Sequence, residues 1–97
     1  MATFIILADF TDQGLRHAKE RISHVDDVLV LAKKSGVTVK HMYWTLGRHD
    51  VVAVFEAPDN ETATAFSLSV ASRGNVRTET LRAFSFDEMK KIHGKMV

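Results

Sequence analysis

Residues 37–57 read VTVKHMYWTLGRHDVVAVFEA, and the fold can be worked out from this segment. β-branched and aromatic residues dominate Val37–Leu46 and Val51–Ala57, which is typical of β-strands. The four residues between them, Gly47-Arg48-His49-Asp50, favour a turn. Two strands joined by so short a connection pair antiparallel, so the sequence predicts a β-hairpin.

The segment before the hairpin predicts one strand and one helix. Thr3–Phe10 is rich in Phe and Ile, which is typical of a strand, and Thr11 offers a hydroxyl that can cap a following helix. Apolar residues then recur at alternating spacings of three and four, which indicates one face of a single helix ending at Gly36. These apolar residues are Leu15, Ala18, Ile22, Val25, Leu29 and Ala32.

The segment after the hairpin predicts a second helix, a fourth strand and a short terminal helix. Pro58–Glu61 ends the third strand and begins a helix whose buried residues are Ala63, Phe66 and Val70. Apolar and polar residues alternate along Val76–Phe84, which predicts a strand. Ser85–Glu88 has the residues of a capping box, and the terminal helix that follows has an apolar stripe of Met89, Ile92 and Met96.

The predicted element order is therefore βαββαβ followed by a C-terminal helix. Right-handed crossovers place both main helices on the same face of a four-stranded antiparallel sheet with strand order 4-1-3-2. This is an α+β, ferredoxin-like fold. A chain of 97 residues has room for one hydrophobic core, so residues 1–97 are predicted to form a single domain.

The central strands of this sheet are apolar on both faces. In the first strand Phe4 and Ile6 point to one side while Ile5 and Leu7 point to the other, and the third strand alternates in the same way. The helices can cover only one face, and monomers rarely expose an apolar face of this size. We therefore expect a homodimer of the α/β-barrel type, in which two sheets pack face to face about a two-fold axis, with larger assemblies also open.

The composition argues against several function classes. Thirteen Lys and Arg against twelve Asp and Glu give a net charge of +1, without the basic surplus of an electrostatic nucleic-acid binder. No apolar run approaches the ~20 residues that span a membrane, and the N-terminus lacks a signal peptide, so a cytoplasmic location is expected. Zero Cys and the absence of paired His motifs predict no metal site, and with no Gly-rich phosphate loop present no cofactor is predicted either.

One face of the hairpin carries polar side chains. A turn at residues 47–50 pairs Leu46 with Val51 and sets His41 opposite Glu56, with Tyr43 on the same face. The His41–Glu56 pair fits an acid–base pair on a pocket floor. The favoured interpretation is a polar pair that protects an edge strand from aggregation or contacts the other subunit, because edge strands commonly carry such pairs.

The turn and the fourth strand carry further candidates. His49 is a candidate general base oriented by the adjacent Asp50 carboxylate, or Asp50 binds local backbone N–H groups as in an Asx turn. Arg82 lies among hydroxyl residues and is a candidate anchor for a carboxylate ligand, or a salt-bridge partner across a subunit interface. Trp44 and the methionines are interpreted as core residues.

Several motifs occur together in an order that is specific to one family. They are FIIL at 4–7, FTDQG at 10–14, YWTLGRHDVVAV at 43–54, EAPD at 56–59 and GNVRTETLRAF at 74–84. From Thr3 to Phe86 the chain resembles the GYD-domain family of small bacterial and archaeal proteins. The family is named for a Gly-x-Tyr-Asp turn. Here His49 replaces the tyrosine while Gly47 and Asp50 are kept, which suits a geometric role for the turn.

This resemblance implies a ferredoxin-like, dimeric α/β-barrel fold, in agreement with the residue pattern. The family is of uncharacterised function, so the resemblance implies no reaction and no catalytic residue.

Three function classes follow from these observations. The first is a homo-oligomeric small-molecule-binding protein with a regulatory or protective role, whose candidate ligand-binding residues are His41, Tyr43, His49, Asp50 and Arg82. The second is a cofactor-independent enzyme of the dimeric α/β-barrel type, monooxygenase- or isomerase-like, which needs a cavity with His41 or His49 near Trp44. The third, RNA binding, is disfavoured because the stacking aromatics and basic residues of such modules are absent. We adopt the first hypothesis and keep the second as the alternative.

Overall fold

The structure, a computed structural model, describes residues 1–17 and 21–97, with the backbone alone described for residues 21–24. The elements follow the predicted order, except that the first helical segment is divided in two. They are β1 (Ala2–Phe10), α1 (Asp12–Arg16), α2 (Arg21–Ser35), β2 (Thr38–Trp44), β3 (Val51–Ala57), α3 (Asn60–Ala71), β4 (Val76–Ala83) and α4 (Phe86–His93).

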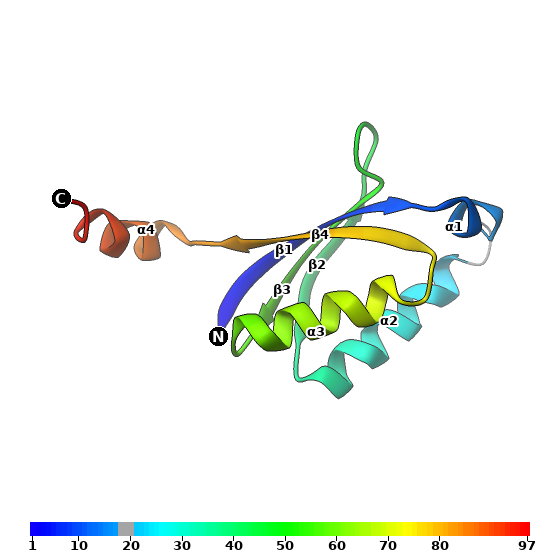
Figure 1. Cartoon of the computed structure of the whole chain (residues 1–97), viewed down its shortest axis with the longest axis horizontal. Helices are drawn as coiled ribbons and strands as arrows, with labels where there is room; N and C mark the ends of the chain where they lie inside the picture. Colours follow the sequence, from blue (N-terminus) through cyan, green and yellow to red (C-terminus); the bar gives the residue numbers. More distant parts are fainter. Residues whose placement is uncertain (18–20) are drawn as a thin grey trace.

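The four strands form one antiparallel sheet in the order β2-β3-β1-β4, which is the predicted 4-1-3-2 order counted from the other edge. α2 and α3 lie along one face of this sheet and contact each other, whereas no described helix lies on the other face (Figure 1). This is the ferredoxin-like α+β fold that the sequence predicts.

The single helix predicted between β1 and β2 is instead two helices. The Thr11 hydroxyl accepts a hydrogen bond from Gly14 N at 3.1 Å and donates one to Gly74 O at 2.6 Å, so α1 is fastened to the corner between α3 and β4. This close approach requires glycine at position 14, since a Cβ there would lie 2.1 Å from Asn75 O. α1 therefore follows that corner, and Leu15 is exposed.

The buried face of α2 is rotated relative to the predicted stripe. Val28 and Ala32 pack in the core, whereas Leu29 is 44% exposed. Successive residues of a helix are about 100° apart, so a face centred on Val28 and Ala32 leaves Leu29 on its flank. Ala18 and the side chain of Ile22, which the predicted stripe includes, lie outside what the structure describes.

The core fills the space between the sheet and the two helices. Phe55 and Phe66 are its largest fully buried side chains. Phe55 stacks on Phe4 with ring centroids 5.4 Å apart and meets Phe66 edge to face at 5.2 Å. Ala57 and Ala63 are fully buried beside them, because small residues let α3 approach the sheet closely.

The β2–β3 hairpin has a wider loop than predicted. Trp44, rather than Leu46, pairs with Val51, and Thr45 N donates to Asp50 O at 2.9 Å across the base of the loop. The register is thus displaced by two residues, with a bulge between Val39 and His41. From His41 to Trp44 this displacement by an even number keeps each side chain on its face, so the faces predicted for these residues are confirmed although the predicted cross-strand pairs are wrong.

The face without helices, called the open face below, is apolar at its centre. Its central residues, all partly exposed, are Ile5, Leu7, Val52, Val54 and Leu81. α4 does not cover them, because it extends away from the end of β4 (Figure 1). The prediction of a sheet with two apolar faces is therefore confirmed.

Candidate functional site

A cavity of about 470 Å³ lies between the sheet and the two helices that cover it. All four strands contribute to its floor, and α2 and α3 contribute Val28, Phe66 and Val70. Ala8 and Ala53 lie in the middle of the floor and fill little volume. The size and the mostly apolar lining fall within the range of small-molecule sites, about 300–1,000 Å³.

Four polar side chains line the same cavity, namely Asp27, Arg73, Asn75 and Thr78. Gln13 Nε2 donates to Asn75 Oδ1 at 3.0 Å and to Arg73 O at 3.1 Å, which fixes the backbone at this end of the cavity. Within the described residues, neither Arg73 nor Asp27 forms an ion pair. Both charges are therefore available to polar groups of a molecule whose apolar part occupies the cavity.

Trp44 forms an aromatic wall of this cavity, and its interpretation as a core residue is wrong. The indole is 52% exposed because β2 is an edge strand. In its row across the sheet, Trp44 is followed by Val51, Ala8 and Thr78. This run of small side chains beside a tryptophan, facing the helices, is the sequence signal that could have indicated the cavity.

His41 and Tyr43 lie on the open face and do not line the cavity. Their rings stack with centroids 6.2 Å apart. The predicted His41–Glu56 pair is wrong, because Val54 lies opposite His41. Glu56 instead contacts Lys40, with Nζ 3.1 Å from Oε1, since the bulge places Lys40 next to it.

His49 and Asp50 each have a partner on β1, so the His49–Asp50 pair, one of the two interpretations of the turn, does not form. His49 Nδ1 lies 3.1 Å from Asp9 Oδ1. Asp50 Oδ2 accepts from Phe10 N at 2.9 Å, and Asp50 N donates to Ala8 O at 3.0 Å. The Asp50 carboxylate thus extends the β1–β3 ladder by one more hydrogen bond, which is a geometric role.

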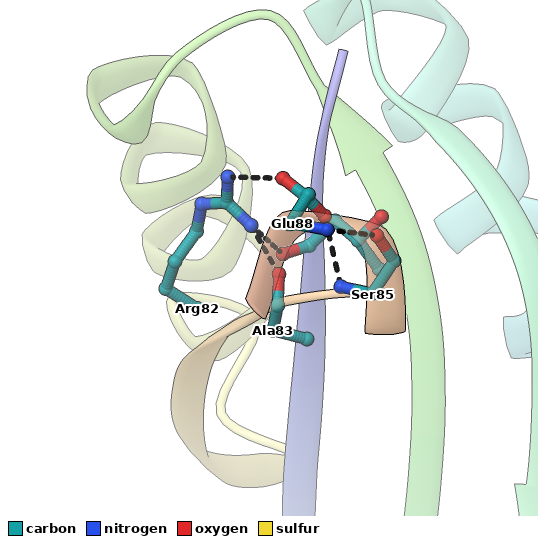
Figure 2. Close-up of polar contacts among 5 residues, drawn as sticks. Arg82, Ala83, Ser85 and Glu88 are labelled. Carbon is teal, nitrogen blue, oxygen red and sulfur yellow. Dashed lines mark hydrogen bonds and ion pairs between the residues drawn. The ribbon is translucent and has the colours of Figure 1, made fainter. Parts of the chain in front are cut away.

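Arg82 already has a carboxylate partner within the chain. Its Nη2 lies 3.3 Å from Glu88 Oε2, and Nη1 donates to the carbonyls of Thr3 and Ala83 (Figure 2). The guanidinium also lies 4.5 Å from the centroid of the Phe84 ring. These contacts use donors that a bound carboxylate would need, and they fasten α4 to the end of β4.

Two helix caps shift the pKa of their carboxyl groups. Hydrogen bonding to the Thr62 side chain, together with the 2.7 Å hydrogen bond from Thr62 N to Asp59 Oδ1, lowers the pKa of Asp59 at the start of α3. A hydrogen bond from the Ser85 backbone N–H lowers the pKa of Glu88, and Arg82 acts in the same direction. Neither carboxyl group lines the cavity, so both effects concern the stability of helix ends.

Within residues 1–17 and 21–97, no three His, Asp or Glu side chains come close enough together to hold a metal ion. In the same part of the chain, no helix combines the length and the apolar composition that a membrane span needs.

Residues 4–93 match the family model of the GYD domain. The chain belongs to the GYD-domain family. Its name-giving turn is the β2–β3 loop, in which Gly47 has a φ of 127° that favours glycine and Asp50 bonds to β1.

Three similar proteins extend this comparison. The chain is 43% identical over 86 residues to a Thermus thermophilus protein named glutamine synthetase and cystathionine beta-lyase binding protein, covering 86% of this chain and 88% of that protein. The crystal structure of FFRP-DM1 superposes with a TM-score of 0.63 at 17% identity, over 87% of this chain and all of that chain.

5-Chloro-2-hydroxyhydroquinone dehydrochlorinase from Burkholderia phenoliruptrix AC1100, solved with 2,5-dihydroxybenzoquinone, superposes with a TM-score of 0.61 at 15% identity, over 90% of this chain and 97% of that one. At such identities the two solved structures establish the fold alone, which is the ferredoxin-like α+β fold.

Proposed function

We propose that this protein is a homodimeric binding protein that takes a small, largely apolar molecule between its sheet and helices and acts in regulation or protection. The cavity of about 470 Å³ is the observation that carries this proposal. Trp44 offers a flat surface for a ring or chain, while Arg73 and Asp27 offer charges for polar groups. A preformed apolar space with few polar groups is the usual form of a small-molecule site.

The proposed ligand contacts differ from the five residues that the sequence suggested. His49, Asp50 and Arg82 are engaged with their own chain. His41 and Tyr43 remain candidates for a second version of the proposal, in which the ligand lies at the dimer interface on the open face. A test must therefore show whether the ligand binds in the cavity or on the open face.

The apolar centre of the open face supports the homodimer. Ile5 and Leu7 of β1 adjoin Val54 and Val52 of β3, and burying such a surface against a second copy removes it from water. The Thermus thermophilus relative supports a further part of the proposal, namely protein partners. We expect this chain to bind the glutamine synthetase and the cystathionine β-lyase of its own organism.

Fluorescence of Trp44 tests the cavity directly, because it is the chain's single tryptophan. Titration with anilinonaphthalene sulfonate, an apolar ring system with one anionic group, should quench or shift the Trp44 emission with saturation. Ala53→Leu narrows the cavity floor and should weaken binding at least tenfold, whereas His41→Ala on the open face should leave it unchanged. Loss of binding in His41→Ala alone would place the ligand at the interface instead.

Protein partners are tested by size-exclusion chromatography of the purified protein with each of the two enzymes. Co-elution at micromolar concentration supports the proposal. Separate elution of both enzymes, with and without a cavity ligand, contradicts the partner part and leaves the ligand part standing.

The alternative is a cofactor-independent enzyme, monooxygenase- or isomerase-like. The cavity and its Trp44 wall favour this alternative, but His41 and His49 do not line the cavity, so Asp27 is the carboxylate left to move a proton there. Turnover of the identified ligand, abolished in Asp27→Asn while its binding persists, would establish an enzyme. A ligand recovered unchanged from the protein supports the binding role.

A further inference from the structure

We infer that α4 is an exchanged arm, which packs its apolar face on a second copy of this chain and enlarges the dimer interface. This inference rests on the homodimer of the proposed function. It goes beyond the sheet-to-sheet contact by assigning the terminal helix α4 to the dimer interface. Four observations carry it: the position of the helix, its amphipathic character, its tether and the area of the interface.

The position of α4 gives it little packing surface on its own chain, where Met89 and Ile92 are only partly buried. The helix follows the end of β4 and points away from the sheet, α2 and α3 (Figure 1). No residue of α4 is buried. The longest dimension of the molecule is 50 Å against 31 and 18 Å for the others, and the projecting helix lies along it.

α4 is nevertheless built as an amphipathic helix. Phe86, Met89 and Ile92 recur at a spacing of three, so they share one side of the helix, and Met96 follows just beyond its C-terminal end. Phe86 is 76% and Met96 72% exposed. Lys91 falls on the opposite side. A helix of eight residues is marginal alone in water, where about 12–15 residues are needed, so burial of this apolar side is required to stabilise it.

The base of the arm is held rigidly. Ser85 and Glu88 form a complete capping box, with Ser85 N to Glu88 Oε1 at 2.9 Å and Glu88 N to Ser85 Oγ at 3.1 Å. Arg82 joins this box to the end of the sheet (Figure 2). A tether of this kind fixes the direction of the helix before it binds, which lowers the entropy cost of docking.

The area of the interface points to a second copy as the occupant. Four strands about 4.8 Å apart, each of seven to nine residues at about 3.3 Å per residue, give a flat footprint of about 480 Å² for each sheet, or about 960 Å² for two. Each helix has a footprint of about 12 × 10 Å, and it covers an equal area of the partner. Two arms therefore enlarge the footprint of the interface by half, to about 1,440 Å², and a larger buried area favours a stable dimer.

The dimer dissociation constant of Ile92→Gln, measured by analytical ultracentrifugation, tests this inference. Ile92→Gln should raise the constant at least tenfold, because each dimer loses two apolar contacts. Lys91→Gln, on the opposite side of the helix, is the matched control and should leave the constant unchanged. Equal constants for the wild type and Ile92→Gln would overturn the arm while leaving the sheet-to-sheet dimer intact. A monomeric wild type would overturn the proposed homodimer itself.

Photochemical crosslinking identifies what the arm touches. The chain has no cysteine, so Met96→Cys labelled with benzophenone maleimide reports the surroundings of the arm alone. We expect crosslinked dimers on a denaturing gel, and none from Lys33→Cys in the last turn of α2. Crosslinks within one chain would show that α4 folds back on its own sheet. Absence of crosslinks together with binding of Met96→Cys to anionic lipid vesicles would mean a membrane surface as the occupant. Either result would contradict the inference.

Discussion

The cavity leads to a comparison of one substitution at two buried alanines of the same strand. Ala53 and Ala57 both lie on the helix-facing side of β3, and they are 8% and 0% exposed. Ala53 lines the cavity, whereas Ala57 is packed against the core without adjoining it. Ala53→Leu and Ala57→Leu therefore add the same side chain to free space in one case and to filled space in the other.

The two variants should differ in stability by several kcal/mol. At position 57 the larger side chain overpacks the core, which costs about 1–3 kcal/mol. At position 53, burial of three added carbon atoms stabilises the fold by about 0.8 kcal/mol each, and the loss of rotamer entropy costs about 0.5–1 kcal/mol, which leaves a gain of at most about 1.9 kcal/mol. In a domain of this size, each 1 kcal/mol shifts the Tm by about 4–8 °C.

Thermal unfolding followed by circular dichroism, with urea titration as a second measure, is the assay. We expect Ala57→Leu to lower the Tm by at least about 4 °C and Ala53→Leu to leave it unchanged or raise it. Equal destabilisation of both variants would show that the space at Ala53 is filled in solution, and the cavity could then not serve as the binding site.

Three further predictions concern α1 and α4. Gly14→Ala should destabilise the protein by at least about 2 kcal/mol in urea titration, since the added Cβ would lie 2.1 Å from Asn75 O. The control is Gly94→Ala, which should change the stability by less than about 0.5 kcal/mol because Gly94 has an αR conformation. Arg82→Met should lower stability by about 1–2 kcal/mol through loss of its hydrogen bonds, and Arg82→Lys should recover less than half because lysine lacks the planar fork. Because the pKa of Glu88 is lowered on folding, its charge stabilises the fold above about pH 4.5, and this contribution is lost as the pH falls through the lowered pKa. The difference in urea midpoint between the wild type and Glu88→Gln should therefore be largest at pH 7 and vanish towards pH 2. A difference that stays constant with pH would contradict this prediction.

The side-chain pattern predicts those parts of the fold that depend on alternation along one element. The two faces of β1 and β3 follow from period two, and the α4 capping box follows from Ser85 and Glu88 alone. The pairing of β2 with β3 depends also on the loop length and on the bulge at Lys40, which no residue pattern reveals. The predicted His41–Glu56 pair was wrong for this reason.

The candidate site was harder to predict because it depends on contacts between distant segments. His49 meets Asp9 and Asp50 meets Phe10, each 40 residues away, while the sequence draws attention to the adjacent His49-Asp50 pair. The cavity itself arises where side-chain volume is missing, at Ala8 and Ala53. Charged residues are readily taken as candidate site residues in a sequence, whereas small residues such as these alanines are not.

The measurement that bears most directly on a homodimeric binding protein is native mass spectrometry of the freshly purified chain beside Ala53→Leu. It reports the number of subunits and any retained molecule together. We predict a dimer with a discrete added mass for the wild type, and a dimer without it for Ala53→Leu. A monomer, or a dimer whose added mass persists in Ala53→Leu, would contradict the account.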